Sequence, residues 1–486
     1  MLPVEGYSNF LWVVLQVPFF LIGAFEPYLT PKLLSLALVG LTFWCLHRML
    51  RIVCGASFWP SLVALTLLSL NASFVIWTSS GLENALYAAG LTTLAYILVR
   101  HGQKQQSDLR LVGLAALAAF AVAITRPDGI LFGIVPVAIW VLDRLWSNRR
   151  DWESTGKTLS VYTTILGVAL ASFVLFRWMY FGDLLPNTYY VKGGPTIATA
   201  VDAVSLQGVY LEKLRELLTS IAGIQLWFPV LLVILAFVFT TLSNLKQSRA
   251  GHAVMLMLLV ALLDYLILPN DYMREFRFAT PFLVFVYPAA VLFFVQLTSG
   301  LNHHKRLRVG FLATAAVVGV ALTLSIHYPR VQMFAKNPTV AFERIAQRYG
   351  HQFNDYADRL GLDEASFLVP DIGGTLYYSR LKIYDLAGLC DQVISRTRGK
   401  NQAAFYDYVF DSLKPTFIHT HGYFTGVSKF DDDPRFLRDY VPIRQYADEY
   451  VNRVYHAKRI SGDFVRLDQV SGRESQLDSL RQGLEK

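Results

Sequence analysis

Hydrophobic positions in this chain form long blocks separated by short polar segments, up to about residue 326. A helix needs roughly 20 mostly apolar residues to cross a bilayer, and a shorter block suffices where polar flanks extend it. The pattern therefore predicts ten membrane spans. They cover residues 33–53, 58–77, 82–99, 109–124, 128–146, 159–181, 226–242, 253–268, 279–297 and 309–326.

An earlier apolar block, residues 9–24, is too short for a span and contains Pro18. If it crossed the membrane, every later loop would change sides. Short apolar or amphipathic segments can instead lie in the membrane interface. We therefore predict an interfacial helix here and place residues 1–32 on the outer side.

Basic residues concentrate in alternate loops between the predicted spans. These loops contain Arg48 and Arg51, then Arg100, Lys104 and Arg110, then Arg144, Arg149, Arg150 and Lys157, then Lys246 and Arg249, and finally Lys305, Arg306 and Arg308. The positive-inside rule assigns such loops to the cytoplasm. The net charge of +8 thus reflects membrane orientation and gives no indication of nucleic-acid binding. The low charged fraction of 16%, against roughly 25% in soluble domains, also favours a membrane protein.

The composition becomes polar after residue 326. Strands are predicted at 367–370, 381–384 and 416–419, and helices at 339–349 and 401–412. A short helix near 208–220 and a terminal helix within 471–486 complete the pattern. The predicted fold is an α-helical polytopic membrane protein of about ten transmembrane helices plus an interfacial helix, residues 1–326. A small C-terminal α/β extracytoplasmic domain follows, residues 327–486.

The polar motifs within the hydrophobic part lie at the outer ends of predicted spans. They are residues 80–84, 125–129, 185–192 and 270–274. A transporter is expected to place its polar groups near mid-membrane, between repeated halves. The pattern instead favours an outward-facing chemical site. Asp264 lies inside a predicted span, where acidic side chains are costly and are usually functional or paired.

The ordered motifs resemble those of the GT-C polyprenyl-phosphate-sugar glycosyltransferases, most closely the terminal β-arabinofuranosyltransferases of mycobacterial cell-wall synthesis. The resemblance rests on Val4-Glu5-Gly6-Tyr7-Ser8-Asn9, Ser80-Gly81-Leu82-Glu83-Asn84, Arg126-Pro127-Asp128, Tyr180-Phe181-Gly182-Asp183, Pro186-Asn187-Thr188-Tyr189-Tyr190-Val191-Lys192, Asp271-Tyr272 with Arg277 and Pro281, and Tyr384-Asp385-Leu386-Ala387-Gly388-Leu389. It extends nearly end to end.

This resemblance implies transfer of a sugar from a polyprenyl-phosphate donor to a cell-envelope glycan or glycolipid. The reaction would take place on the outer face of the cytoplasmic (inner) membrane, with membrane lipids as further partners and no nucleic acid. A divalent cation, Mg or Mn, is the cofactor to consider. Two other hypotheses remain: a transporter or flippase of lipid-linked sugars, and a non-catalytic scaffold for envelope assembly.

The reaction needs cations for the donor phosphate and a base for the acceptor hydroxyl. The candidate phosphate ligands are Arg126, Lys192, Arg274 and Arg277. The alternative for each is a basic side chain reaching toward lipid headgroups. Arg126 could instead pair with Asp128 or Glu83 and hold loops together.

The resemblance also suggests roles for acidic and polar residues. The catalytic candidates are Glu5, Glu83 and Asp271, although capping of a helix is the alternative for Glu83 and pairing with nearby arginines for Asp271. The candidates for sugar or acceptor binding are Asn187, Tyr189 and Asp128, with a Pro-Asn turn as the alternative for Asn187.

One departure from the family concerns the N-terminus. Enzymes that resemble this chain begin with a further span and an outer loop that carries an acidic pair. The present sequence starts just before the Val4-Glu5-Gly6-Tyr7 segment and lacks both. The expectation is a misplaced start at Met1. The alternative is a remnant without the usual base, in which catalysis would move to Glu5, Glu83 or Asp271 or give way to a scaffold role.

Overall fold

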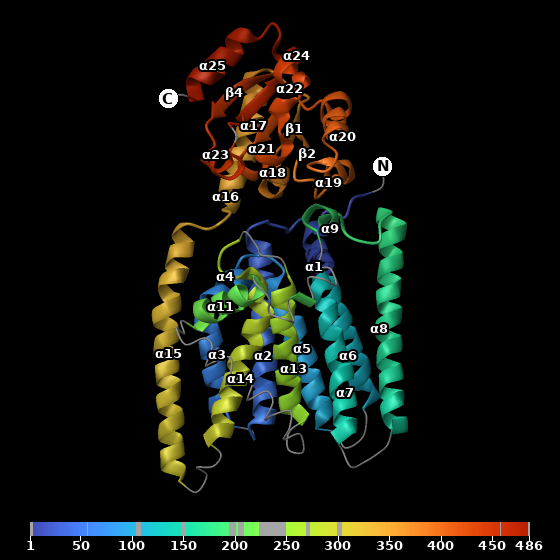
Figure 1. Ribbon diagram of the computed structural model, residues 1–486, viewed down its shortest axis with the longest axis vertical. Helices are drawn as coiled ribbons and strands as arrows, with labels where there is room; N and C mark the ends of the chain where they lie inside the picture. The colour runs from blue at the N-terminus through green and yellow to red at the C-terminus, as the bar shows by residue number, and fades with distance from the viewer. Residues whose placement is uncertain are drawn as a thin grey trace. The chain divides into compact units, whose positions relative to one another are not determined.

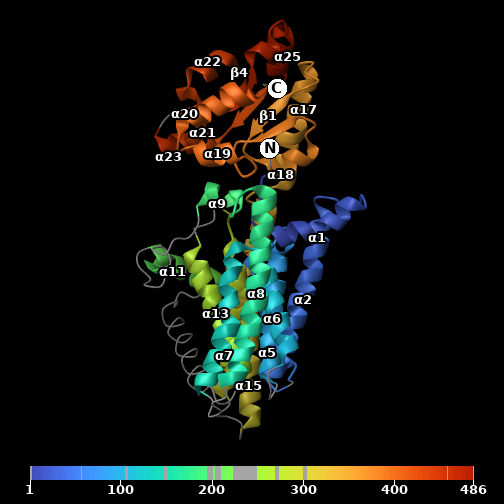
Figure 2. The same ribbon diagram turned by 90° about the vertical axis from the view of Figure 1, so that its right-hand side faces the viewer.

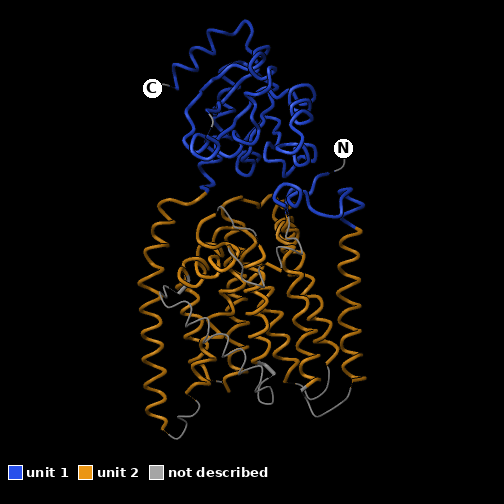
Figure 3. Tube along the Cα trace, in the orientation of Figure 1, with its two compact units in different colours: residues 1–7, 176–194, 340–486 blue, residues 8–175, 195–339 orange. Residues whose placement is uncertain are grey.

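The computed structural model describes residues 3–55, 57–103, 108–146, 152–193, 201–202, 209–222, 249–268, 273–298, 304–456 and 458–484. The chain divides into two compact units (Figure 3). Unit 1 comprises Met1–Tyr7, Phe176–Gly194 and Val340–Lys486, and unit 2 comprises Ser8–Leu175 and Pro195–Thr339. The sequence predicted a boundary between residues 326 and 327, whereas a continuous helix crosses that position.

Unit 2 is a bundle of helices that run alongside one another in both ribbon views (Figures 1 and 2). The described helices are α1 (Phe10–Leu21), α2 (Leu29–Val53), α3 (Trp59–Leu70), α4 (Ala72–Ser79), α5 (Asn84–Gly102), α6 (Leu109–Thr125), η1 (Pro127–Gly133), α7 (Ile134–Trp146), α8 (Trp152–Phe181), α11 (Val209–Ala222), α13 (Arg249–Ile267), η2 (Arg277–Ala279), α14 (Thr280–Leu297) and α15 (Lys305–Lys336). The last residues of α8 belong to unit 1. Nine of the ten predicted spans coincide with these helices, and 226–242 lies outside the described residues.

Helix α5 lies at the centre of this bundle. It contacts α2, α6, α13 and α14, and most of its residues are buried. Small residues allow this close packing. A Cβ atom added to Gly90 would lie 2.9 Å from Cγ2 of Val122 on α6, so a larger residue there would push the two helices apart.

Four helical segments among the described residues are long and apolar enough to cross a membrane: Leu29–Val53, Trp152–Phe181, Arg277–Leu297 and Lys305–Lys336. The most apolar stretches of Trp152–Phe181 and Lys305–Lys336 bury almost no residues against protein. An apolar helix exposed in this way is expected to face lipid, because the described part of the chain leaves it uncovered. The predicted number of ten crossings remains a prediction.

The predicted span 58–77 is divided into two helices. Helices α3 and α4 meet at Asn71 with a bend of 72°. The Asn71 side chain accepts a hydrogen bond from the backbone N–H of Phe74 at 3.0 Å and so caps α4. Asparagine favours such a cap over a helix interior, which explains the break.

The short helix predicted at 9–24 is confirmed as α1. It contacts α6 and α2, and the indole N–H of Trp12 donates to the carbonyl of Gly81 at 3.2 Å. Large apolar side chains on its other side, including Phe20 and Leu21, are exposed. Such a helix can present an apolar face to a membrane interface.

Unit 1 contains a five-stranded sheet in the order β2-β1-β3-β5-β4. The strands are β1 (Ser366–Val369), β2 (Lys382–Asp385), β3 (Phe417–Thr420), β4 (Tyr440–Tyr446) and β5 (Ser461–Arg466). Strands β1, β2 and β3 are parallel, while β5 pairs antiparallel with both β3 and β4. The first three strands confirm the sequence prediction. Strands β4 and β5 were not predicted.

Helices pack on both faces of this sheet. The described helices of unit 1 are, in chain order, α9 (Asn187–Lys192), α16 (Phe342–Ile345), η4 (Ala346–His351), α17 (Gln352–Arg359), α18 (Ile372–Tyr378), α19 (Gln392–Thr397), α20 (Gln402–Tyr406), η5 (Asp407–Leu413), α21 (Gly422–Ser428), η6 (Phe430–Asp432), α22 (Pro434–Asp439), α23 (Glu449–Tyr455), α24 (Leu467–Val470) and α25 (Glu474–Leu484). Phe367 and Phe417 join one hydrophobic core, with residues of α17 and α25. Leu368 and Ile418 join the other core, with residues of α20 and η5. Alternate strand residues thus face opposite layers.

Candidate functional site

The motif at residues 125–129, at the end of α6, has a backbone conformation that only a few residue types permit. Helix α6 ends at Thr125, Arg126 is extended, and Pro127 begins η1. Proline is well suited to a first helical position. A Cβ atom on Gly129 would lie 2.4 Å from the carbonyl oxygen of Val122, so only glycine fits. This turn directs Arg126 and Asp128 toward the start of α5.

Arg126 lies between two carboxylates in unit 2. Its Nε lies 3.1 Å from both carboxylate oxygens of Asp128, and its Nη1 donates to Oε1 of Glu83 at 3.2 Å. The other oxygen of Glu83, Oε2, accepts from the amide of Asn9 at 3.2 Å. The pairing of Arg126 with Asp128 and Glu83, one of the two alternatives from the sequence, is therefore present. Arg126 and Glu83 are both buried, which makes these charge-assisted contacts important for the local fold.

Aromatic rings line the same cluster. The guanidinium carbon of Arg126 lies 4.7 Å from the ring centre of Phe278, and that of Arg277 lies at the same distance from this ring. The Tyr87 hydroxyl donates to Asp128 at 3.4 Å. The Asn84 side chain donates to the carbonyl of Arg277 and to the Thr280 hydroxyl, each at 2.9 Å. The start of α5 thereby fixes the segment that carries Arg277.

Asp264, the acidic residue predicted inside a span, is buried on α13. Neither of its carboxylate oxygens has a hydrogen-bond partner among the described residues. Its electrostatic neighbours are Asp128, Arg126 and Lys213. Burying an acid without hydrogen bonds is costly, so these neighbours make Asp264 part of the same charged cluster.

A second group of motifs comes together in unit 1. Arg177 holds Glu5 through two hydrogen bonds, from Nε to Oε2 at 2.6 Å and from Nη2 to Oε1 at 3.2 Å. Burial raises the pKa of the Glu5 carboxyl above its usual range, and Arg177 opposes this effect. The Glu5 carbonyl accepts the backbone N–H of Asn187 at 3.0 Å. Glu5 therefore anchors the segment before α9.

Asn187 is buried, and both ends of its side-chain amide form hydrogen bonds to protein groups. The amide nitrogen donates to the carbonyls of Gly388 at 2.7 Å, Leu389 at 3.0 Å and Asp391 at 3.3 Å. The amide oxygen accepts from the Ser395 hydroxyl at 2.9 Å. The Pro186–Lys192 and Tyr384–Leu389 motifs thus bind each other, and both amide N–H groups of Asn187 serve this contact.

The remaining predicted residues are more exposed or lie outside the described part of the chain. Lys192 and Arg274 are exposed, and the side chain of Tyr189 is 41% accessible. Asp271 lies outside the described residues. The described residues bring Glu83, Arg126, Asp128 and Arg277 together in unit 2, and Glu5 and Asn187 together in unit 1. Sequence reasoning did not identify Tyr87, Phe278 or Arg177, because nothing local distinguishes them from other aromatic and basic residues.

The described residues contain no group of three or more histidine, cysteine, aspartate or glutamate side chains that could hold a metal ion. The predicted divalent cation therefore has no ligand set within the part of the chain that the structure describes. Further candidates such as Asp271 lie beyond it.

Comparison of the whole structure with solved structures shows a GT-C-like fold. The archaeal oligosaccharyltransferase AglB from Archaeoglobus fulgidus, in complex with an inhibitory peptide and a dolichol-phosphate, superimposes with a TM-score of 0.51 at 10% sequence identity. A structure of the Archaeoglobus fulgidus oligosaccharyltransferase with Zn and sulfate gives a TM-score of 0.52, also at 10% identity. The match covers 85% of the present chain in both cases, and 61% and 59% of those chains.

Sequence comparisons are less informative than the fold. Residues 340–466 match a family described as Domain of unknown function (DUF8728). No curated protein matches the chain. The fold is therefore assigned, while the similarity leaves the donor and the acceptor open.

Proposed function

We propose that this protein is a membrane glycosyltransferase that transfers a sugar from a polyprenyl-phosphate donor to a cell-envelope glycan or glycolipid, on the outer face of the cytoplasmic membrane. The observation that carries the proposal is the contact of Arg126 with Glu83 and Asp128, and of Arg126 and Arg277 with the Phe278 ring, within a GT-C-like fold. Pairs of cations and carboxylates are what such a reaction requires. The motif order favours an arabinofuranose-like donor.

The proposed reaction is a displacement at the anomeric carbon of the donor sugar. An acceptor hydroxyl oxygen forms the new bond to that carbon while the bond between carbon and phosphate oxygen breaks. The electron pair of the broken bond leaves with the polyprenyl phosphate, and the hydroxyl proton passes to a carboxylate. Negative charge grows on the phosphate, so a nearby guanidinium lowers the barrier.

Arg277 is the residue we assign to the donor phosphate. Arg126 already directs Nε and Nη1 at Asp128 and Glu83, so a phosphate would have to displace those carboxylates. Arg277 packs on the same Phe278 ring and is held by its backbone through Asn84. We assign Arg126 the positioning of the two carboxylates. Arg274 and Lys192, both exposed, are further candidates for contacts to phosphate or lipid headgroups.

Glu83 is the carboxylate we assign as the base. Its Oε1 is bound by the Arg126 guanidinium, whereas its Oε2 accepts a neutral amide bond from Asn9. A neutral amide holds an oxygen less strongly than a cation does, so Oε2 is the more available acceptor. Asp128 and Tyr189 remain candidates for sugar hydroxyls, and Asp271 for a second acid. We assign Glu5 and Asn187 to holding unit 1 together.

No step of this scheme passes through a metal ion, because the described residues do not supply a ligand set. A cation held by the donor phosphate itself would add positive charge beside Arg277 and leave the roles of the side chains unchanged.

Transfer measured in membranes tests the proposal. Membranes containing the full chain are incubated with radiolabelled polyprenyl-phosphate arabinofuranose and endogenous glycan acceptors. We expect Arg277→Ala and Glu83→Gln each to reduce transfer by about 100-fold or more, as expected for removal of a transition-state partner. Arg277→Lys should keep part of the activity, since it retains the charge.

The matched control is Arg215→Ala, which removes an exposed arginine of α11 that pairs with Glu212. This variant should transfer at the wild-type rate. Undiminished transfer by Arg277→Ala and Glu83→Gln, at equal protein levels in the membrane, would contradict the proposal. A wild-type protein without transfer but with a stable envelope-protein complex would favour the scaffold.

A further inference from the structure

The sheet of unit 1 changes winding direction between β1 and β3. From β1 the chain passes through α18 to β2 on one side, and later returns to β3 on the other side of β1. All three strands are parallel. Open α/β sheets bind ligands outside the carboxyl ends of their strands at such a switch point. The residues that follow β1 and β3 therefore lie where sheets of this kind bind ligands.

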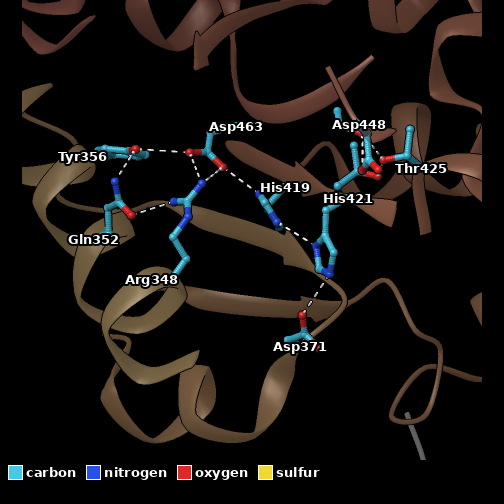
Figure 4. Close-up of polar contacts among 11 residues, drawn as sticks. Arg348, Gln352, Tyr356, Asp371, His419, His421, Thr425, Asp448 and Asp463 are labelled. Atoms are coloured by element: carbon cyan, nitrogen blue, oxygen red, sulfur yellow. Dashed lines mark hydrogen bonds and ion pairs between the residues drawn. The ribbon is translucent and has the colours of Figure 1, made fainter. Parts of the chain in front are cut away.

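Polar side chains occupy this position. Asp371 follows the end of β1 by two residues, and His421 directly follows β3. His421 Nε2 lies 3.5 Å from Asp371 Oδ2, and both side chains are about one third exposed. Figure 4 shows the two side chains at the end of a longer polar chain. Residues separated by 50 positions in sequence thus meet at the switch point.

The polar chain continues into the core of unit 1. His421 Nδ1 lies 2.9 Å from His419 Nε2, and His419 Nδ1 lies 2.6 Å from Asp463 Oδ1. Arg348 donates to both oxygens of Asp463, at 2.9 and 2.7 Å, and the Tyr356 hydroxyl donates to Oδ2 at 3.2 Å (Figure 4). Burial raises the pKa of the Asp463 carboxyl, but the bonds from His419 and Arg348 hold it below its usual range. Asp463 is therefore an anion.

These contacts favour one set of proton positions on the two histidines. Burial lowers the pKa of His419 to about 4, so its ring is neutral at pH 7. Its Nδ1–H donates to the Asp463 carboxylate, and its Nε2 accepts the Nδ1–H of His421. Burial also lowers the pKa of His421, with Asp371 acting in the opposite direction. Burial raises the pKa of the Asp371 carboxyl, with His421 acting in the opposite direction. When His421 is neutral and Asp371 is ionised, two hydrogen-bond acceptors lie 3.5 Å apart.

Two adjacent acceptors call for a ligand that donates at two neighbouring points. The neighbouring hydroxyl groups of a sugar meet this requirement. Aromatic rings lie nearby: the Tyr349 ring is nearly parallel to His421, with centroids 6.2 Å apart, and the Phe424 ring lies 6.0 Å away. The adjacent Tyr423 is half exposed. Tyr349 itself is buried, so Phe424 and Tyr423 are the rings that provide an apolar surface for the C–H face of a sugar, alongside the few polar groups that fix its orientation.

We propose that the β1–β3 edge of unit 1 is a glycan-binding site, in which His421 Nε2 and Asp371 accept hydrogen bonds from neighbouring sugar hydroxyls. Asp463 and His419 act as positioning residues, since they hold His421 in the tautomer that presents Nε2 as an acceptor. The identification of this glycan as the acceptor of the reaction rests on the proposed function; the binding of glycan does not.

Binding to the full chain in lipid nanodiscs tests the site. The probe is a mixture of short oligosaccharides released from the cell-envelope glycan of the expressing cells, with saturation-transfer NMR as the readout. Wild-type protein should give transfer to sugar protons, and His421→Gln and Asp371→Asn should weaken apparent affinity at least tenfold. His351→Gln is the matched control, because His351 is an exposed histidine of the same unit whose ring packs on Tyr378. It should bind as the wild type does.

Several results would overturn the proposal. No saturation transfer with wild-type protein, or equal transfer with His421→Gln and Asp371→Asn, would remove the glycan site. Binding that requires added Zn²⁺ or Mg²⁺ would identify a metal site instead. A positioning role for His419 predicts that His419→Gln weakens binding while the His421→Gln/His419→Gln double variant is no weaker than His421→Gln alone.

The same proteins separate this proposal from the proposed function. Arg277→Ala should bind glycan normally and fail in transfer. His421→Gln should bind weakly and show its defect mainly as a raised KM for the acceptor. Glycan binding by a wild-type protein that shows no sugar transfer would reject the transferase proposal and leave the binding site in place.

Discussion

His419 shows how one buried side chain can make the stability of unit 1 depend on pH. Its pKa falls from 6.5 to about 4 in the fold because the ring is desolvated, while Asp463 opposes the shift. The unfolded chain therefore binds the proton more tightly than the folded chain does. The contribution of neutral His419 to the stability of the folded state is complete above pH 6.5 and is lost as the pH falls toward 4. Such a shift corresponds to about 3 kcal/mol.

Thermal unfolding of the full chain between pH 4.5 and 8 tests this expectation. The glutamine of His419→Gln cannot bind a proton, so the stability of this variant lacks the pH dependence that His419 causes. The variant should therefore be less stable than wild type by the largest amount at pH 7–8, and the difference in stability should become smaller below pH 6.5. Titrating groups that both proteins share, such as Asp385, contribute about equally to the two stabilities and therefore cancel when one is subtracted from the other. His351→Gln should run parallel to wild type. A deficit of His419→Gln that stays constant across the pH range would contradict the prediction.

Asn187 shows how a motif can act between elements. Its amide joins α9 to α19, through Ser395, and to the segment before α19, through Gly388, Leu389 and Asp391. We expect Asn187→Ala to destabilise this junction by about 1–3 kcal/mol, because the buried carbonyls lose their donor. Hydrogen exchange measured by mass spectrometry should then rise in residues 184–193.

Tyr189→Phe provides the comparison for Asn187→Ala, since it changes an exposed side chain of the same helix. Its exchange should match that of wild type. If residues 184–193 exchange equally in all three proteins, the amide of Asn187 does not hold α9 in place.

Elements were predictable from sequence where hydrophobic pattern alone determines them. Long apolar blocks indicated the helices, and β1 to β3 are short apolar runs. Strands β4 and β5 contain Pro442, Gly462 and Asp463, residues that are uncommon in strands, and they form because neighbouring strands offer hydrogen-bond partners. The break at Asn71 was missed for a similar reason, since one asparagine hardly changes an apolar block.

The candidate site was predictable only in part. Glu83, Arg126 and Asp128 were identified as a possible pair network because they lie in polar motifs at span ends. The contact between Phe278 and the Arg126 guanidinium joins residues that are 152 positions apart in the sequence. No local sequence pattern indicates such a contact. The separation of the motifs into one group in unit 2 and another in unit 1 likewise follows from the folded chain and could not be predicted from the sequence.

At the scale of the whole molecule, the orientation of the chain in the membrane can be tested by cysteine labelling. The positive-inside rule predicts that Lys305 is cytoplasmic and that unit 1 is outside. We expect Lys305→Cys to react with a membrane-impermeant maleimide only after the cells are permeabilised, and Asp363→Cys to react in intact cells. Both changes are made in a variant with Cys45, Cys54 and Cys390 replaced by serine.

Permeabilised cells show whether each cysteine is reactive at all. Reaction of Lys305→Cys in intact cells, or protection of Asp363→Cys, would reverse the assigned orientation. The proposed outward-facing chemistry would then need to be reconsidered.

The composition of unit 1 from three separate stretches limits how its parts can be exchanged. The matched family region, residues 340–466, contains the loop bound by Asn187 but neither Asn187 nor Glu5. A chimera that replaced only the tail with that of a relative would pair a foreign loop with the original anchors. An exchangeable module must therefore carry residues 1–7 and 176–194 as well, and substitutions in any one stretch are expected to require compensating changes in the other two.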